Sequence, residues 1–320
     1  MVDNMNEGPM SRTSTQERNA DSEALRALAA STPALPFESV EVKIAPAQRL
    51  GSITASVADK HGNIYVYHRP KKDTLQDPIV VIDAKGSVLR SFGKGLDPMP
   101  HGIEIDPAGN LWTVDAHTSM VRKLTPQGEK LLEVSVGDIP FPDKLFCGAT
   151  GTAFRKDGHF YVADGYCNAR VIEYTADGRK VREWGRKGSG PGEFNLVHDI
   201  SAAADGTIYI ADRENGRAQW FDPDGRYLGE KHFGGQLYSV AVGPDGMVYA
   251  GAQTRATAGD RGFSNIYKFD PATGDIIGRV EVVAHQLTVG PDGSLYPGTA
   301  QAKISDDPNA TSIAVFQPPK

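Results

Sequence analysis

Three histidines stand in equivalent places of a repeated sequence pattern. His101, His198 and His285 each lie eight residues before a glycine that is flanked by two alternating apolar runs. Neutral imidazoles bind zinc well, and three of them leave a fourth coordination position open for a substrate oxygen. The spacing therefore predicts a catalytic zinc site, provided that the fold brings the three repeats together at this position.

The repeat itself consists of an apolar-alternating run, a polar turn with glycine, and a second alternating run with an aromatic residue. The turn glycines are Gly62, Gly109, Gly158, Gly206, Gly246 and Gly293. Such a turn between alternating runs predicts a β-hairpin, since glycine accepts the positive φ of a tight turn. Further strand-like runs follow each hairpin, so each unit has about four strands and roughly 40–50 residues, the size of a propeller blade. We predict an all-β fold, a six-bladed β-propeller; a β-sandwich array is the alternative.

The turn glycine also serves as a ruler across the six blades. Eight residues before it stand Thr54, His101, Thr150, His198, Tyr238 and His285. This position opens the innermost strand, and histidine fills it in alternate blades, so three imidazoles should converge on the axis at one mouth of the central channel. A single histidine there would indicate an ordinary channel-lining residue, whereas three of the eight histidines in one register favour a metal. For the other five we expect surface or packing roles: His61, His68, His117, His159 and His232.

Residues seven or eight positions after the turn glycine should return to the same mouth. Arg69, Tyr166 and Arg213 occupy such positions. Arginine binds a carboxylate with two N–H donors, and nearby positive charge favours the phenolate form of tyrosine, which can act as a general base. We therefore predict that these three residues share an active site with the zinc.

Composition restricts the remaining choices. The net charge of −6 argues against nucleic acid as a partner, which requires a basic surface, and no apolar run is long enough to cross a membrane.

Residues 1–36 are polar with a short helix-like stretch and are predicted to form a flexible tail, so the catalytic propeller should span residues 37–320. Its closing blade should include the N-terminal strand FESVEVKI. We expect a monomer, and without a visible signal peptide a cytoplasmic location; a secreted or periplasmic one applies if the N-terminus is truncated.

Four motifs resemble a known family of propellers with NHL repeats, the peptidyl-α-hydroxyglycine α-amidating lyases. They are YHR at residues 67–69, HGIEID at 101–106, DGYCNAR at 164–170 and ADRENGR at 211–217. The resemblance covers about residues 45–300. It implies that the zinc ligands are His101, His198 and His285, that Tyr166 is the catalytic base, and that Arg69 and Arg213 are active-site arginines. The two cysteines alone leave a bridge or two free thiols open; the resemblance implies a Cys147–Cys167 disulfide.

The resemblance also implies a calcium ion in the channel. Its ligands would be the backbone carbonyls of Ser56 and Ile103 and an aspartate directly after the third histidine, where this chain has Gln286. A neutral amide oxygen binds calcium more weakly than a carboxylate, so we expect a lower calcium affinity. Val283 also replaces a family methionine, and both differences lie beside the substrate site.

The reaction that the resemblance implies cleaves the C–N bond of a carbinolamide into an amide and glyoxylate. We expect a substrate of this class, either a peptide or a small N-acyl-α-hydroxyglycine. Two alternatives are a metal-dependent propeller hydrolase or lactonase, whose channel should hold calcium with carboxylates, and a non-catalytic NHL module that binds a protein or RNA. The channel histidines disfavour the first, and the negative net charge disfavours the second.

Overall fold

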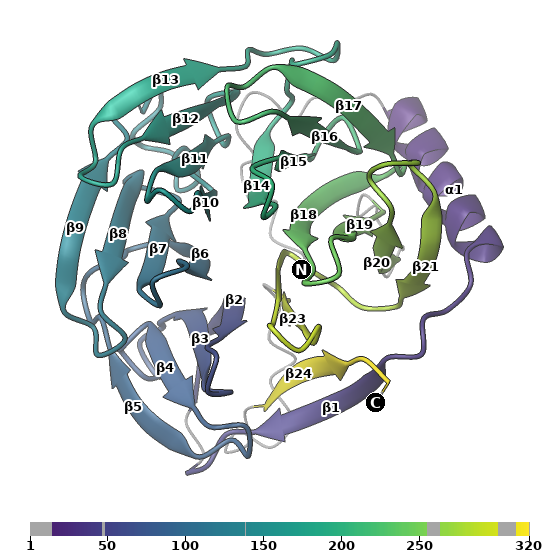
Figure 1. The fold of residues 1–320 in the computed structure, drawn as a ribbon. Helices are drawn as coiled ribbons and strands as arrows, with labels where there is room; N and C mark the ends of the chain where they lie inside the picture. Colours follow the sequence, from purple (N-terminus) through teal and green to yellow (C-terminus); the bar gives the residue numbers. More distant parts are fainter. Residues whose placement is uncertain (1–14, 47–48, 138, 255–262, 300–311, 320) are drawn as a thin grey trace.

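Six four-stranded antiparallel sheets surround a central channel (Figure 1). The computed structural model describes residues 15–46, 49–137, 139–254, 263–299 and 312–319. Each sheet is one blade, and in five of them the strands follow the chain order from the channel outward. The predicted six-bladed β-propeller is confirmed. None of the helices in these ranges combines the length and the apolar character that crossing a membrane requires.

The strands of the first three blades have the following bounds. Blade 1 contains β2 (Ser52–Ala58), β3 (Ile64–Arg69), β4 (Ile79–Ile82) and β5 (Val88–Phe92). Blade 2 contains β6 (Pro100–Ile105), β7 (Leu111–Asp115), β8 (Met120–Leu124) and β9 (Lys130–Ser135). Blade 3 contains β10 (Gly151–Phe154), β11 (Phe160–Asp164), β12 (Arg170–Tyr174) and β13 (Lys180–Trp184).

The other three blades continue the ring. Blade 4 contains β14 (Val197–Ala202), β15 (Ile208–Asp212), β16 (Arg217–Phe221) and β17 (Tyr227–His232). Blade 5 contains β18 (Gln236–Val242), β19 (Val248–Gln253), β20 (Ser264–Phe269) and β21 (Ile276–Val280). Blade 6 contains β22 (Gln286–Val289), β23 (Leu295–Gly298), β24 (Ser312–Gln317) and, from the N-terminal side, β1 (Glu38–Lys43).

The turns between the two inner strands of every blade match the predicted pattern. All six predicted turn glycines have φ between +77° and +93°. This left-handed region costs glycine little and other residues much more, so the glycines fix where each inner hairpin reverses. The hairpin turns therefore lie at one end of the channel, and the starts of the innermost strands lie at the other.

Blade 6 closes the ring with both ends of the described chain. Its strand order is β1-β24-β23-β22, and β1 pairs antiparallel with β24 from Glu38 opposite Gln317 to Lys43 opposite Ser312. The prediction that FESVEVKI completes the closing blade is confirmed. The pairing removes an unpaired strand edge that would otherwise be open to other chains.

The hydrophobic core lies between neighbouring blades rather than at the axis. In one cluster, Tyr161 and Val171 of blade 3 pack against Ile208, Ile210 and Phe221 of blade 4, all nearly inaccessible to solvent. Each blade needs its neighbours because a single four-stranded sheet cannot bury both of its faces. This packing holds the innermost strands at fixed positions around the channel.

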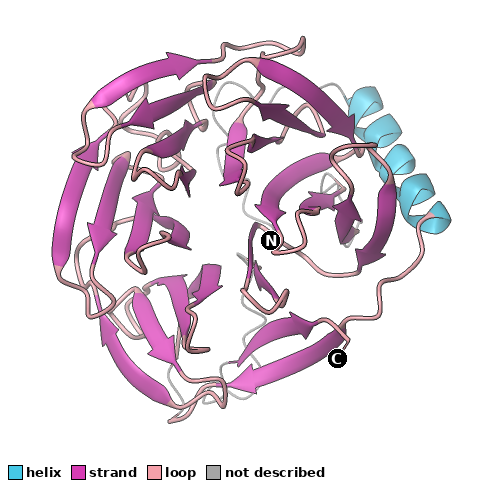
Figure 2. Ribbon diagram, in the orientation of Figure 1, coloured by secondary structure: helices cyan, strands magenta, loops and turns pink. Residues whose placement is uncertain are grey.

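The N-terminal segment is more ordered than the sequence predicts. A helix, α1 (Thr15–Ser31), lies against the outside of blade 5 (Figure 2). Its Leu25 and Ala29 are buried, and the Ala29 carbonyl accepts a hydrogen bond of 3.0 Å from Arg279 Nε. Residues 15–31 of the predicted tail thus form a helix that packs two apolar side chains of one face on the propeller. Residues 1–14 lie outside the described residues.

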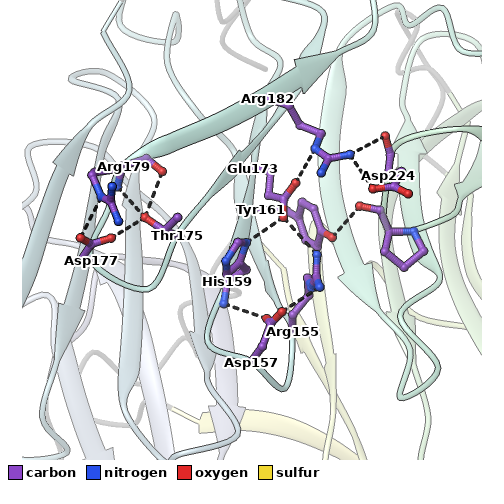
Figure 3. Close-up of polar contacts among 11 residues, drawn as sticks. Arg155, Asp157, His159, Tyr161, Glu173, Thr175, Asp177, Arg179, Arg182 and Asp224 are labelled. Carbon is purple, nitrogen blue, oxygen red and sulfur yellow. Dashed lines mark hydrogen bonds and ion pairs between the residues drawn. The ribbon is translucent and has the colours of Figure 1, made fainter.

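A polar cluster joins blades 3 and 4 at the end that carries the hairpin turns (Figure 3). We call it the Glu173 cluster; it consists of Arg155, His159, Glu173, Arg182 and Asp224. The buried Glu173 carboxylate accepts from Arg155 at 3.1 Å and from His159 Nδ1 at 2.8 Å, and forms an ion pair with Arg182 at 2.8 Å. Arg182 also donates to Asp224 of blade 4 at 2.6 Å. The cluster thus links the two blades through one carboxylate.

Candidate metal centre at one mouth of the channel

The structure brings the three predicted ligands together. His101 lies in β6, His198 lies in β14, and His285 directly precedes β22. One ring nitrogen from each lies within 4.8 Å of the others, and the ring centroids are 4.8–5.0 Å apart. Three imidazoles at this separation can hold a metal ion.

A β-bulge gives each of the two strand histidines its orientation. The pairing of β14 with β15 shifts between Val197 and Asp199, which leaves His198 unpaired, and that of β6 with β7 shifts between Pro100 and Ile103, which includes His101. A bulge turns a side chain away from the regular alternation and is frequent next to active sites. The bulges therefore turn these imidazoles toward the channel axis.

The backbone of the next blade fixes the Nδ1 atoms of two of the three histidines. His101 Nδ1 lies 2.7 Å from the Thr150 carbonyl, and His198 Nδ1 lies 2.7 Å from the Tyr238 carbonyl. A carbonyl only accepts, so both Nδ1 atoms carry the proton and Nε2 offers its lone pair to the centre. The Nδ1 of His285 is instead buried without a hydrogen-bond partner among the described residues.

The environment of the three imidazoles keeps them uncharged. Burial, followed by the charge of Arg69, lowers the pKa of His101 to about 3. Burial also lowers the pKa values of His198 and His285 well below the usual range, and the neighbouring histidines act in the same direction. Neutral imidazole is the form that binds metals, so at neutral pH the three rings are in the state that could hold a metal ion.

Tyr166 lies between two of the histidines. Its hydroxyl is 2.9 Å from His101 Nε2 and 3.2 Å from His198 Nε2, and the side chain is buried. The Phe146 ring packs against it at a centroid distance of 5.2 Å. Cys147 and Cys167, which flank this contact, form a disulfide, as the family resemblance implies. The bridge joins the loop before β10 to the loop of Tyr166.

Arg69 reaches the same centre from the end of β3. Its Nε donates to the Pro100 carbonyl at 3.0 Å, and its guanidinium lies 5.0 Å from the centre of the Phe146 ring. Among the described residues, Nη2 is buried with no hydrogen-bond partner. The positive charge of Arg69 lowers the pKa values of His101 and His285, which places it toward the imidazoles. Arg69 therefore presents a buried donor suited to an anionic group.

Arg213, which follows β15, approaches from blade 4. It is 3% exposed, and its Nε donates to Glu214 Oε1 at 2.7 Å. Its charge lowers the pKa of all three histidines. The two arginines thus differ, because Arg213 forms an ion pair with a buried carboxylate whereas the Nε of Arg69 donates to a carbonyl.

Sequence reasoning missed three residues of this mouth: Phe146, Glu214 and Tyr238. Tyr238 occupies the same register position as the histidines, which was visible in the alignment of the blades. Glu214 directly follows Arg213, and Phe146 directly precedes Cys147. Nothing in their types or spacing distinguished these two from ordinary core and loop residues.

Two residues of the predicted calcium site, Ser56 and Gln286, make hydrogen bonds within the protein. Thr288 Oγ1 donates to the Ser56 carbonyl at 2.8 Å, and Gln286 Nε2 donates to the His198 carbonyl at 3.2 Å. Ile103 lies in β6 and pairs with Thr113. Gln286 thus acts as a hydrogen-bond donor at this point, a role that an aspartate could not fill. Calcium binding stays a prediction.

A cavity of about 790 Å³ opens at the other end of the channel. Hairpin-turn residues line it, including His61, Gly109 and Gly290, and Glu104 lines it as well. Burial and the charge of Asp199 raise the pKa of Glu104 well above the usual range. The converging imidazoles, the phenol and the guanidiniums all lie at the opposite mouth, so we assign the chemistry there.

Comparison of the sequence with known proteins gives three informative relatives. Peptidyl-glycine alpha-amidating monooxygenase A of Xenopus laevis is 37% identical over 200 residues, which cover 58% of this chain and 21% of that protein. A probable peptidyl-alpha-hydroxyglycine alpha-amidating lyase of Caenorhabditis elegans is 32% identical, with 55% and 57% covered. Peptidyl-alpha-hydroxyglycine alpha-amidating lyase 2 of Drosophila melanogaster is 29% identical, with 82% and 70% covered. No family model matches the chain.

The chain spans about a fifth of the length of the Xenopus protein. Among solved structures, a catalytically inactive variant of virginiamycin B lyase from Staphylococcus aureus with quinupristin superposes with a TM-score of 0.58 at 14% identity, covering 87% of this chain and 88% of that one. At this identity the likeness shows the fold alone. Together with the sequence relatives, the comparisons confirm the resemblance that the motifs predict: the chain is a six-bladed β-propeller homologous to proteins named peptidyl-α-hydroxyglycine α-amidating lyases.

Proposed function

We propose that this protein is a zinc-dependent lyase that cleaves N-acyl- or peptidyl-α-hydroxyglycine into an amide and glyoxylate. The observation that carries the proposal is the meeting of three neutral imidazoles with the Tyr166 hydroxyl, which is 2.9 Å from His101 Nε2. Three nitrogen donors and an open fourth position suit catalytic zinc. The lyase-named relatives support the reaction class.

His101, His198 and His285 would hold the zinc ion. Bound there, zinc would act as a Lewis acid toward the substrate hydroxyl and lower its pKa. The Nδ1 contacts of His101 and His198 to backbone carbonyls keep their Nε2 lone pairs directed at the centre. The neutral state of the imidazoles, which burial enforces, keeps these ligands available at neutral pH.

Tyr166 and Arg69 would handle the proton and the carboxylate. The deprotonated Tyr166 oxygen accepts the hydroxyl proton of the substrate; the C–O bond becomes a carbonyl as the C–N bond breaks. The electron pair leaves with the amide nitrogen, which takes up the proton, so that the products are the amide and glyoxylate. The buried Nη2 of Arg69 donates to the substrate carboxylate, which stabilises its charge throughout.

The test is incubation of the zinc-loaded protein with benzoyl-α-hydroxyglycine, with benzamide and glyoxylate followed together by chromatography. We expect the two products in equal amounts, well above the rate without protein. Tyr166→Phe should retain zinc and lose about 10²- to 10⁴-fold in kcat, because the base is gone. A zinc-loaded protein that forms no glyoxylate above the buffer control, or a Phe variant as fast as the parent, would contradict the proposal.

A further inference from the structure

Tyr238 takes, in blade 5, the place that histidine takes in blades 2, 4 and 6. The pairing of β18 with β19 shifts between Leu237 and Ser239, so a bulge turns Tyr238 toward the mouth as it turns His198. Its ring centroid lies 4.9 Å from that of His198 and 5.8 Å from that of His285. The side chain is half-buried, so its ring forms part of the wall of the centre.

The ring of Tyr238 also supports the Arg213 guanidinium, which lies 5.0 Å from its centre. The other contacts close a circuit of four residues. Arg213 Nε donates to Glu214 Oε1 at 2.7 Å, and Gln236 Nε2 donates to the same oxygen at 2.7 Å. The Tyr238 hydroxyl donates to Gln236 Oε1 at 3.4 Å. The circuit joins blade 4 to blade 5 at the edge of the candidate metal centre.

We propose that Tyr238 is a positioning residue that orients the Arg213 guanidinium toward the candidate metal centre, where it would bind the substrate carboxylate together with Arg69; the proposal rests on the proposed function. A guanidinium is planar, so its N–H donors point in directions set by that plane. The aromatic face fixes the plane from one side, and the Glu214 carboxylate fixes its Nε edge. Arg213 then meets the anion without losing side-chain freedom on binding.

A purely structural role for Tyr238 makes a different prediction. Glu214 and Gln236 are buried and hold each other without the phenol ring, and the His198 Nδ1 contact is to the Tyr238 backbone carbonyl. Removal of the ring therefore keeps the hydrogen bond of His198 Nδ1, and we expect its main effect on Arg213. A packing residue would instead change stability, and its effect would be independent of Arg213.

The experiment compares Tyr238→Leu and Tyr238→Phe with the parent. The Leu variant should bind zinc with the parent stoichiometry and lose about 3- to 30-fold in kcat/KM, the range of a cation–π contact. The Phe variant, which keeps the ring face, should recover most of that loss. Tyr227→Leu, which removes a half-exposed tyrosine from outer strand β17 of blade 4, is the matched control and should leave kcat/KM unchanged.

Two further measurements make the outcome decisive. In an Arg213→Met background, Tyr238→Leu should have almost no further effect, because the two residues act as one unit. Glyoxylate titrated into the cobalt(II)-substituted protein, followed by visible absorption, should bind several-fold more weakly to the Leu variant. An undiminished effect in the Met background, a Phe variant as impaired as Leu, or unchanged glyoxylate affinity would overturn the proposal.

The titration needs no turnover, so it tests Tyr238 even if the parent fails to form glyoxylate. Such a failure would count against the proposed function alone.

Discussion

Two regions of the propeller use histidine in opposite ways. In the Glu173 cluster, His159 gives its Nδ1 to a buried carboxylate at 2.8 Å, beside two arginines (Figure 3). At the other end of the channel, the Nδ1 atoms of His101 and His198 contact neutral backbone carbonyls, and their Nε2 atoms both lie within 3.2 Å of the Tyr166 hydroxyl. In the first arrangement a carboxylate pairs with cationic side chains. In the second, the nitrogen lone pairs of neutral imidazoles lie close together.

The two regions differ in the charges that surround the histidines. Opposite charges in the Glu173 cluster compensate one another, so the cluster links blades 3 and 4 without a ligand, and loss of one partner would leave a buried charge unpaired. The three imidazoles at the mouth bring no negative charge, and two guanidiniums lie close by. Such a centre could bind a metal ion together with an anionic ligand, which is the chemistry that the proposed function uses.

Exchange of one histidine in each region gives the largest expected contrast. His198→Gln should bind less than one zinc per chain and lose about 10³-fold or more in kcat/KM, since metal catalysis supplies several kcal/mol. His159→Gln should keep both zinc and activity. Zinc is measured by atomic emission and activity by glyoxylate release; full zinc occupancy in the His198 variant would show that the two regions do not differ as described.

Substitution of Glu173 should lower the stability of the fold and leave zinc binding and activity unchanged. Glu173→Gln leaves Arg155 and Arg182 without their shared carboxylate, and we expect a loss of about 1–3 kcal/mol in the free energy of unfolding. The lower part of this range allows for screening, because both arginines are partly exposed. Urea titration measures the loss, and glyoxylate release should stay at the parent rate. Reduced zinc or activity in this variant would contradict the independence of the two ends.

The last contrast concerns the acid stability of the metal-free protein. Burial lowers the pKa of His101 to about 3, whereas an unfolded histidine titrates near pH 6.5. Below about pH 6.5 the unfolded chain therefore binds protons that the folded chain does not, so stability falls as the pH falls. The triple variant His101→Gln, His198→Gln, His285→Gln should lose less stability than the parent between about pH 7 and pH 5. Urea titrations at the two pH values measure the loss. An equal loss of unfolding free energy in the parent and the triple variant would contradict the buried, neutral state of the triad.

Much of this arrangement was predictable because the repeat imposes one geometry on six blades. The turn glycine fixes the hairpin, and the distance from it placed His101, His198 and His285 at equivalent points. The bulge that turns His198 could not be predicted from the sequence, since it depends on how two strands pair rather than on residue type. The packing of Leu25 was missed for a related reason: a short amphipathic stretch predicts a helix but not the surface that buries it.

The contacts between neighbouring blades could not be predicted from the sequence either. That the Thr150 and Tyr238 carbonyls accept from histidines of the preceding blade follows from the rotation between neighbouring sheets, which the sequence of one blade does not encode. The Arg213–Glu214 pair lies within one loop, yet its link to Gln236 requires blade 5 to lie beside it. Residue patterns predict each blade well, and the interactions between blades require the assembled ring.

The closing blade has a consequence for the order in which the molecule forms. His285 lies directly before β22, and that sheet is completed by β1 from the other end of the described chain. We expect the candidate ligands from blades 2, 4 and 6 to meet only after these distant segments have paired, a slow, non-local step. Metal capture should therefore come late, after ring closure, so that zinc uptake during refolding would report completion of the whole circle rather than of any one part.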